Sequence, residues 1–244
     1  MVLRDINFYW HVVLICLYFM HGSCLADHKQ FARKMEPIVS RAIDLVAAYK
    51  KDHTLLMPII AIAGAPAVGK SYFARELANL LRAQHIEVKV LAQDDFLERC
   101  KVSGYLIHPY LNYKKLHKVL KQISKGDGEV FQPIINGVKD NLVSYAGTDL
   151  VIFEGVYSLC GSESFDFFKY CSFGIFMEGN EKDVCAWHWE RELLKPSNIR
   201  RSKSQFRREL KLNMIDYRSH ILPCRHNGEF IVYKKEKSKY SLRS

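Results

Sequence analysis

The chain has 244 residues, of which 48% are hydrophobic and 25% charged, an ordinary composition for a soluble globular protein with room for one α/β domain. Its formal net charge of +10 favours either a site that handles phosphates or a surface for anionic macromolecules. Because the sequence shows no zinc-finger spacing, RNA-binding signature or leucine heptad, we expect no nucleic-acid partner.

The seven cysteines give no sign of a disulfide framework. Their number is odd and no C-x-x-C pair occurs, which also argues against a structural zinc site. We expect buried or unreactive thiols in a reducing compartment. The cysteines are Cys16, Cys24, Cys100, Cys160, Cys171, Cys185 and Cys224.

The N-terminal segment, residues 1–26, contains no Asp, Glu, Lys or Arg after residue 5 and has an apolar centre. Three interpretations are open. The segment is the core of a signal peptide, a marginal membrane anchor, or sequence upstream of a true start at Met20 or Met35. The next segment, residues 27–56, reads as a helical extension, with Pro37 in the first turn and an apolar stripe along residues 36–51.

Residues 64–71 match the pattern G-x-x-x-x-G-K-[ST] of a phosphate-binding loop. The apolar run before it, residues 58–63, predicts a buried strand, and residues 72–82 have helical spacing. Backbone amides and the helix N-terminus would then hold phosphate oxygens. Lys70 would reach the β and γ phosphates, and the Ser71 hydroxyl would hold Mg²⁺. The predicted nucleotide-binding residues here are Gly64, Ala65, Pro66, Ala67, Val68, Gly69, Lys70, Ser71 and Tyr72.

A second predicted strand, residues 87–91, leads into Asp94 and Asp95. Ligands of open α/β sheets bind beyond the carboxyl ends of the strands. A carboxylate there could orient an acceptor hydroxyl and take its proton, or cap the following helix. We favour Asp94 over Asp95 as the base.

The remaining elements continue the alternation of strands and helices, which predicts a mostly parallel sheet with helices on both faces. We expect no ordered structure after Tyr233, so residues 234–244 read as a basic tail. The predicted elements are a helix at 111–124, a hairpin at 129–143 around Asn136-Gly137, strands at 149–153, 171–177 and 229–233, and helices at 181–194 and 200–220.

Two further groups would complete a site for phosphoryl transfer. Glu154 ends an apolar strand and would contact Mg²⁺ directly or through water, and Gly155 would leave room beside the loop. A basic stretch containing Arg191, Arg200 and Arg201 would close over the transferred group as a lid. The alternative for this stretch is a solvated helix face with glutamate partners.

These residues resemble the phosphoribulokinase, uridine kinase and pantothenate kinase group of P-loop kinases, over residues 58–233. Uridine–cytidine kinases carry Q-D-S-F-Y, D-x-x-x-F-E-G and H-P elements similar to residues 93–97, 149–155 and 108–109. Bacterial pantothenate kinases carry A-V-G-K-S, an aromatic lid segment and I-L-P-T-R, similar to residues 67–71, 187–191 and 221–225.

The resemblance implies site roles as well as a fold. It makes Asp94 the residue that activates the acceptor, Glu154 the Mg²⁺-linked acid and His108 a neighbour of the acceptor. Tyr113 could line the same pocket, although packing is at least as good an explanation. Arg191 would assist Lys70 and Asp94 in catalysis.

We therefore predict a P-loop kinase domain at residues 57–233, which moves the γ-phosphate of Mg-ATP to a hydroxyl of a small metabolite. The leading acceptor is a nucleoside such as uridine, with pantothenate as the runner-up. A nucleotide-binding regulator or ATPase without a small acceptor is the other alternative. Because ATP chemistry belongs in the cytosol, we expect a cytoplasmic domain, with membrane contact through residues 1–26 left open.

Overall fold

A computed structural model describes residues 29–52, 54–98, 111–134, 139–161, 166–236 and 239–243. The predicted N-terminal segment 1–26, the turn at Asn136-Gly137 and the predicted acceptor neighbour His108 lie outside the described residues. Within the described part, none of the helices combines the length and the hydrophobicity that crossing a membrane requires.

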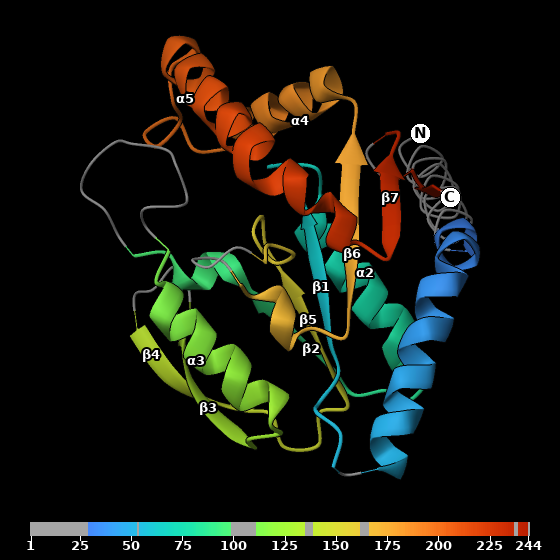
Figure 1. Cartoon of the computed structure of the whole chain (residues 1–244). Helices are drawn as coiled ribbons and strands as arrows, with labels where there is room; N and C mark the ends of the chain where they lie inside the picture. The colour runs from blue at the N-terminus through green and yellow to red at the C-terminus, as the bar shows by residue number, and fades with distance from the viewer. Residues whose placement is uncertain are drawn as a thin grey trace, which may run out of the picture.

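The core is a six-stranded sheet in the order β2-β5-β1-β6-β7-β8 (Figure 1). The first five strands are parallel, as predicted, and the last runs antiparallel to its neighbour. The prediction of disorder after Tyr233 is wrong, because a final strand pairs with the strand before it. The strands are β1 (Ile59–Gly64), β2 (Val88–Ala92), β5 (Leu150–Glu154), β6 (Phe173–Gly179), β7 (Phe230–Lys234) and β8 (Tyr240–Arg243).

The central strand β1 is buried on both faces, and its residues alternate between two apolar layers. Ile60 and Ile62 face a layer that includes the helix of residues 29–51 and α2 (Lys70–Arg82). Ile59 faces a layer that includes α3 (Tyr113–Ser124). The predicted cover of helices on both faces is confirmed.

The helix of residues 29–51 begins earlier than the sequence pattern indicated and belongs to the main core. Its buried side chains recur every three or four residues, the period of a helix face. The ring of Phe31 meets that of Phe73 on α2 edge-on, with the centroids 5.6 Å apart. The buried residues of this helix are Phe31, Met35, Ile38, Ala42 and Val46.

The predicted hairpin is confirmed as the antiparallel pair β3 (Glu129–Ile134) and β4 (Lys139–Ser144), which packs beside α3. Three short helical turns also lie along the chain: η1 (Gln93–Phe96), η3 (Phe168–Tyr170) and η5 (Leu222–Asn227).

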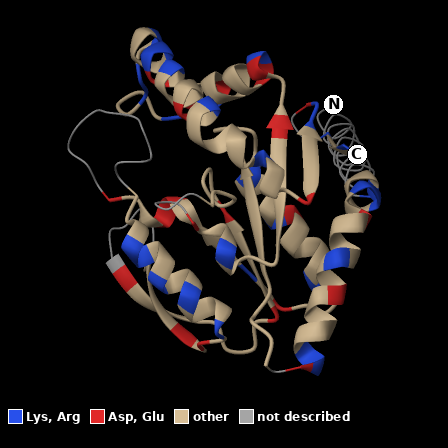
Figure 2. Cartoon of the chain, viewed as in Figure 1, with Lys and Arg blue, Asp and Glu red and all other residues tan. Residues whose placement is uncertain are grey.

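Two helices, α4 (Glu181–Leu193) and α5 (Lys203–Asp216), lie at the end of the molecule where β6 leads into α4. Figure 2 shows Lys and Arg residues along α5. The predicted helix 200–220 is shorter than expected: its first residues form a linker, and after α5 the backbone changes to a π-helix, η4 (Tyr217–Ile221). We call residues 181–216 the lid.

Removing a buried side chain from the helix of residues 29–51 tests whether this helix contributes to the stability of the core. We expect Ile38→Ala to lower the free energy of unfolding by about 2–4 kcal/mol, because the side chain is fully buried and its loss leaves a cavity. Urea unfolding followed by circular dichroism measures this. Ser40→Ala, on the exposed face of the same helix, is the control. Equal midpoints for the two variants would show that this helix adds nothing to the core.

Candidate phosphate-binding and catalytic site

The loop between β1 and α2 has the backbone of a phosphate cradle. Gly64 and Gly69 have φ of 142° and 100°, in the region that favours glycine. A Cβ on Gly64 would stand 2.2 Å from the carbonyl oxygen of Met177 on β6, so a side chain there is excluded. Because α2 begins at Lys70, directly after the loop, its unpaired amides and positive dipole end point into the cradle.

Lys70 is folded over this loop and buried. Its Nζ donates hydrogen bonds to the carbonyl oxygens of Gly64, at 3.2 Å, and Ala65, at 3.0 Å. Burial lowers the pKa of Lys70, while the charges of Glu154 and Asp94 oppose that change. The ammonium group therefore stands close to two carboxylates, and its contact with the β and γ phosphates stays a prediction.

The carboxylate of Glu154, at the end of β5, accepts a hydrogen bond of 2.7 Å from the Ser71 hydroxyl. Burial raises the pKa of Glu154, Lys70 and Ser71 counteract this, and Asp94 and Asp95 raise it further. The two residues predicted to hold Mg²⁺ are therefore in direct contact.

This pair suits magnesium in its donor atoms, because Mg²⁺ prefers oxygen ligands and keeps several waters. Among the described residues, however, no group of three or more His, Cys, Asp or Glu side chains is arranged to hold a metal ion. A magnesium ion held by Ser71 and Glu154 would therefore need water and nucleotide oxygens to complete its coordination.

The aspartates reach the same site from the neighbouring strand. Ala92 of β2 pairs with Glu154 of β5, and Asp94 and Asp95 follow at once in η1. The exposed Asp94 affects the pKa of both Lys70 and Glu154. The half-buried Asp95 affects the pKa of Glu154 and also that of Tyr145, on the chain leading to β5. Asp94 thus acts electrostatically on both Lys70 and Glu154, and its role as the base stays a prediction.

Sequence reasoning missed the part that Gln93 plays in holding these aspartates. This side chain is fully buried, and its Oε1 accepts a hydrogen bond of 3.0 Å from the backbone amide of Tyr157. A Cβ on Gly155 would stand 2.3 Å from the Cβ of Gln93. Gly155 therefore makes room for Gln93, and not for the loop as expected.

The lid arginines divide into two groups. Arg191, on α4, is exposed and close enough to Lys70 to lower its pKa. Arg200 donates two hydrogen bonds, of 3.2 and 2.9 Å, to the backbone carbonyl of Lys195, beyond the end of α4. Arg200 therefore holds the linker that follows α4, and its predicted contact with phosphate stays a prediction.

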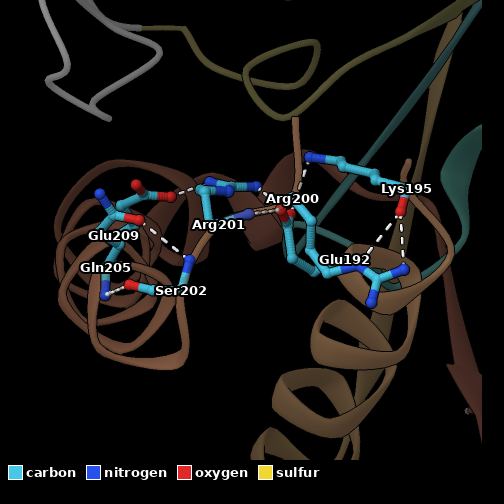
Figure 3. A network of polar contacts seen from close by, with 7 residues as sticks. All are labelled: Glu192, Lys195, Arg200, Arg201, Ser202, Gln205 and Glu209. Atoms are coloured by element: carbon cyan, nitrogen blue, oxygen red, sulfur yellow. Dashed lines mark hydrogen bonds and ion pairs between the residues drawn. The ribbon is translucent and has the colours of Figure 1, made fainter. Parts of the chain in front are cut away.

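Arg201 lies between two buried carboxylates of the lid (Figure 3). Its guanidinium pairs with Glu192 of α4 at 2.5 Å and with Glu209 of α5, whose side chains are 1% and 4% exposed. Hydrogen bonds from Arg201 hold the pKa of Glu192 well below its usual range. Arg201 therefore joins α4 to α5, and its predicted contact with phosphate also stays a prediction.

A second lysine stands beside the loop and was missed in the sequence. Lys234 belongs to the segment that the sequence predicts as a basic tail, yet it is buried at the end of β7. Its Nζ lies 4.1 Å from the centroid of the Trp187 ring and 3.3 Å from where a Cβ on Gly69 would stand. Its position at the carboxyl end of a parallel strand, like that of Glu154, was the signal that could have revealed it.

Two predicted ligand-contacting tyrosines are held by ring packing. Tyr113, the first residue of α3, stacks on Phe167 with the centroids 6.2 Å apart. The exposed Tyr72, on α2, stacks on Tyr240 at 6.5 Å. Contacts of Tyr113 with an acceptor and of Tyr72 with a nucleotide stay predictions.

The ion pairs of Arg201 with Glu192 and Glu209 predict a large loss of stability when Arg201 is replaced. We expect Arg201→Met to lower the free energy of unfolding by about 3–5 kcal/mol, because it leaves the buried Glu209 without its ion-pair partner and the buried Glu192 with Lys195 alone. Arg207→Met, on an exposed position of α5, should change it by less than about 0.5 kcal/mol. Chemical unfolding measures both, and similar values for the two variants would contradict the role assigned to Arg201.

Comparisons with known proteins show which proteins this chain is similar to. The family described as chromatin associated protein KTI12 matches residues 57–122. A pantothenate kinase from Halalkalibacterium halodurans is 26% identical over 72% of this chain and 67% of its own length. One from Myxococcus xanthus is 30% identical over 64% of this chain and 56% of its own length. The chain thus spans between 56% and 67% of the length of these two relatives.

The fold agrees with that of a solved kinase. Phosphoribulokinase from Rhodobacter spheroides superposes with a TM-score of 0.56, covering 73% of this chain and 70% of the other, at 11% identity. Taken with the phosphate loop and the order of the strands, these likenesses show that the chain resembles the phosphoribulokinase, uridine kinase and pantothenate kinase group of P-loop kinases.

Proposed function

We propose that this protein transfers the γ-phosphate of ATP to a hydroxyl group of pantothenate or a chemically related hydroxy acid. The observation that carries the proposal is the position of Asp94, whose charge acts on the buried ammonium of Lys70 from across the phosphate loop. The acceptor class rests on the matched relatives, which are named pantothenate kinases. The nucleoside acceptor expected from the sequence receives less support than this alternative.

Each residue has a defined part in the proposed reaction. The amides of the loop and Lys70 would hold the phosphates in line with the acceptor. Asp94 would orient the acceptor hydroxyl and take its proton. Arg191 would stabilise the charge on the phosphoryl group as it moves. A magnesium ion, when bound by Ser71 and Glu154, would neutralise charge on the β and γ phosphates.

One observation favours a second candidate. The KTI12 family match covers the phosphate loop and the aspartates but ends before Glu154 and the lid. A nucleotide-binding regulator without a small acceptor needs the phosphate loop and the aspartates more than it needs Glu154 and the lid. Turnover with and without acceptors separates the two functions.

An acceptor panel tests the proposed substrate class. Labelled ATP and the full chain are incubated with pantothenate, other hydroxy acids and nucleosides. We expect label to move to pantothenate or a hydroxy acid. Transfer to uridine instead would restore the nucleoside interpretation, and hydrolysis that no acceptor stimulates would favour the regulator.

Two substitutions separate phosphate binding from acceptor activation. We expect Asp94→Asn to lower kcat by about 10²–10⁴-fold, the usual effect of losing a general base, while ATP still binds. Lys70→Ala should lower kcat and weaken ATP binding together, because it removes the charge that meets the phosphates. Kinetics and calorimetric titration measure these effects. Asp44→Asn, on the exposed face of the N-terminal helix, is the matched control. Unchanged turnover by Asp94→Asn would remove the proposed base.

A further inference from the structure

Two cysteines that lie far apart in the sequence meet near the base of the lid. Cys160 follows β5, and Cys224 lies in η5. The thiols of Cys224 and Cys160 are hydrogen-bonded to each other, with the two Sγ atoms 2.6 Å apart. Both thiols also lie against the carbonyl oxygen of His220, at 3.4 Å for Cys160 and 3.0 Å for Cys224. The fold therefore brings together a dithiol that no sequence spacing indicated.

The two thiols differ in exposure. Cys160 is 2% exposed, whereas Cys224 is only partly buried. The contact between them raises the pKa of Cys160 and lowers that of Cys224. The thiolate of this pair therefore forms first at Cys224, the thiol that solvent reaches.

Cys224 also lines a cavity of about 710 Å³, whose other lining residues include Asp166, Lys169, His220 and His226. A small molecule carrying a reactive disulfide can therefore reach Cys224 through this cavity. The mixed charges of its lining suit a zwitterionic peptide such as glutathione. The cavity is lined by η3, η4, η5 and the chain after β5, and no residue of the phosphate loop lines it.

We propose that Cys160 and Cys224 form a modification site that is oxidised to an intramolecular disulfide by a small disulfide such as oxidised glutathione. The Cys224 thiolate attacks one sulfur of oxidised glutathione, forming a mixed disulfide and releasing one glutathione thiolate. The thiol of Cys160 then loses its proton, and its sulfur attacks the sulfur of Cys224 and releases the second glutathione. Two protein thiols are oxidised, and one glutathione disulfide is reduced to two thiols.

The bond would close a loop that contains the whole lid. Its two ends are 64 residues apart, and β6, α4 and α5 lie between them. Such a crosslink reduces the entropy of the unfolded chain, so the melting temperature should rise on oxidation. The proposal does not depend on the acceptor or on catalysis.

The test uses the full chain, incubated with oxidised glutathione and then mapped by mass spectrometry without reduction. We expect one crosslinked peptide pair joining Cys160 to Cys224, a higher melting temperature, and reversal of both by dithiothreitol. Cys160→Ser should stop the reaction at a mixed disulfide on Cys224. Cys185→Ser, outside the pair, should leave the crosslink unchanged.

Three results would overturn the proposal. In the first, both thiols stay unreacted in the folded protein. In the second, glutathione remains attached to Cys224 in the unsubstituted chain without exchange. In the third, Cys160 or Cys224 is found bonded to a different cysteine.

Discussion

The site depends on one buried charge, the ammonium group of Lys70. Removing an ion from water is unfavourable unless other groups replace the lost hydration. Here the carbonyl oxygens of Gly64 and Ala65 accept its hydrogen bonds, and the carboxylates of Glu154 and Asp94 oppose the effect of burial on its pKa. A polyphosphate would add negative charge at the same place, so the protein has a local electrostatic reason to bind one.

The order of the strands determines which groups surround this lysine. β5 comes much later in the chain than β1, yet it inserts between β1 and β2. Because all three strands are parallel, the phosphate loop, the aspartates and Glu154 meet at one edge of the sheet. Gln93 and Gly155 then fit together closely enough to fix η1 against the end of β5. The relative positions of Asp94, Lys70 and Glu154 therefore follow from sheet topology.

The positive charge of the lid has two different uses. Arg201 pairs with two buried carboxylates, one of which also pairs with Lys195, and so connects α4 to α5, while Arg191 remains exposed and lowers the pKa of Lys70. The ion pairs of Arg201 therefore fix the helix that carries Arg191 to its neighbour α5. Some of the chain's basic residues, such as Arg201, are thus held in ion pairs within the protein, while others, such as Arg191, remain available for anionic ligands.

The sequence by itself determined the phosphate loop, the mostly parallel sheet and the carboxylates at the ends of β2 and β5. These follow from local rules: glycines where the backbone needs them, apolar runs for buried strands, and ligands at the carboxyl ends of strands. Tertiary structure alone decided the burial of Lys234, the pairing of Arg201 and the meeting of Cys160 with Cys224. In each of these cases the partners belong to separate elements, and the period of a strand or helix shows which face a residue takes but not which distant residue will meet it.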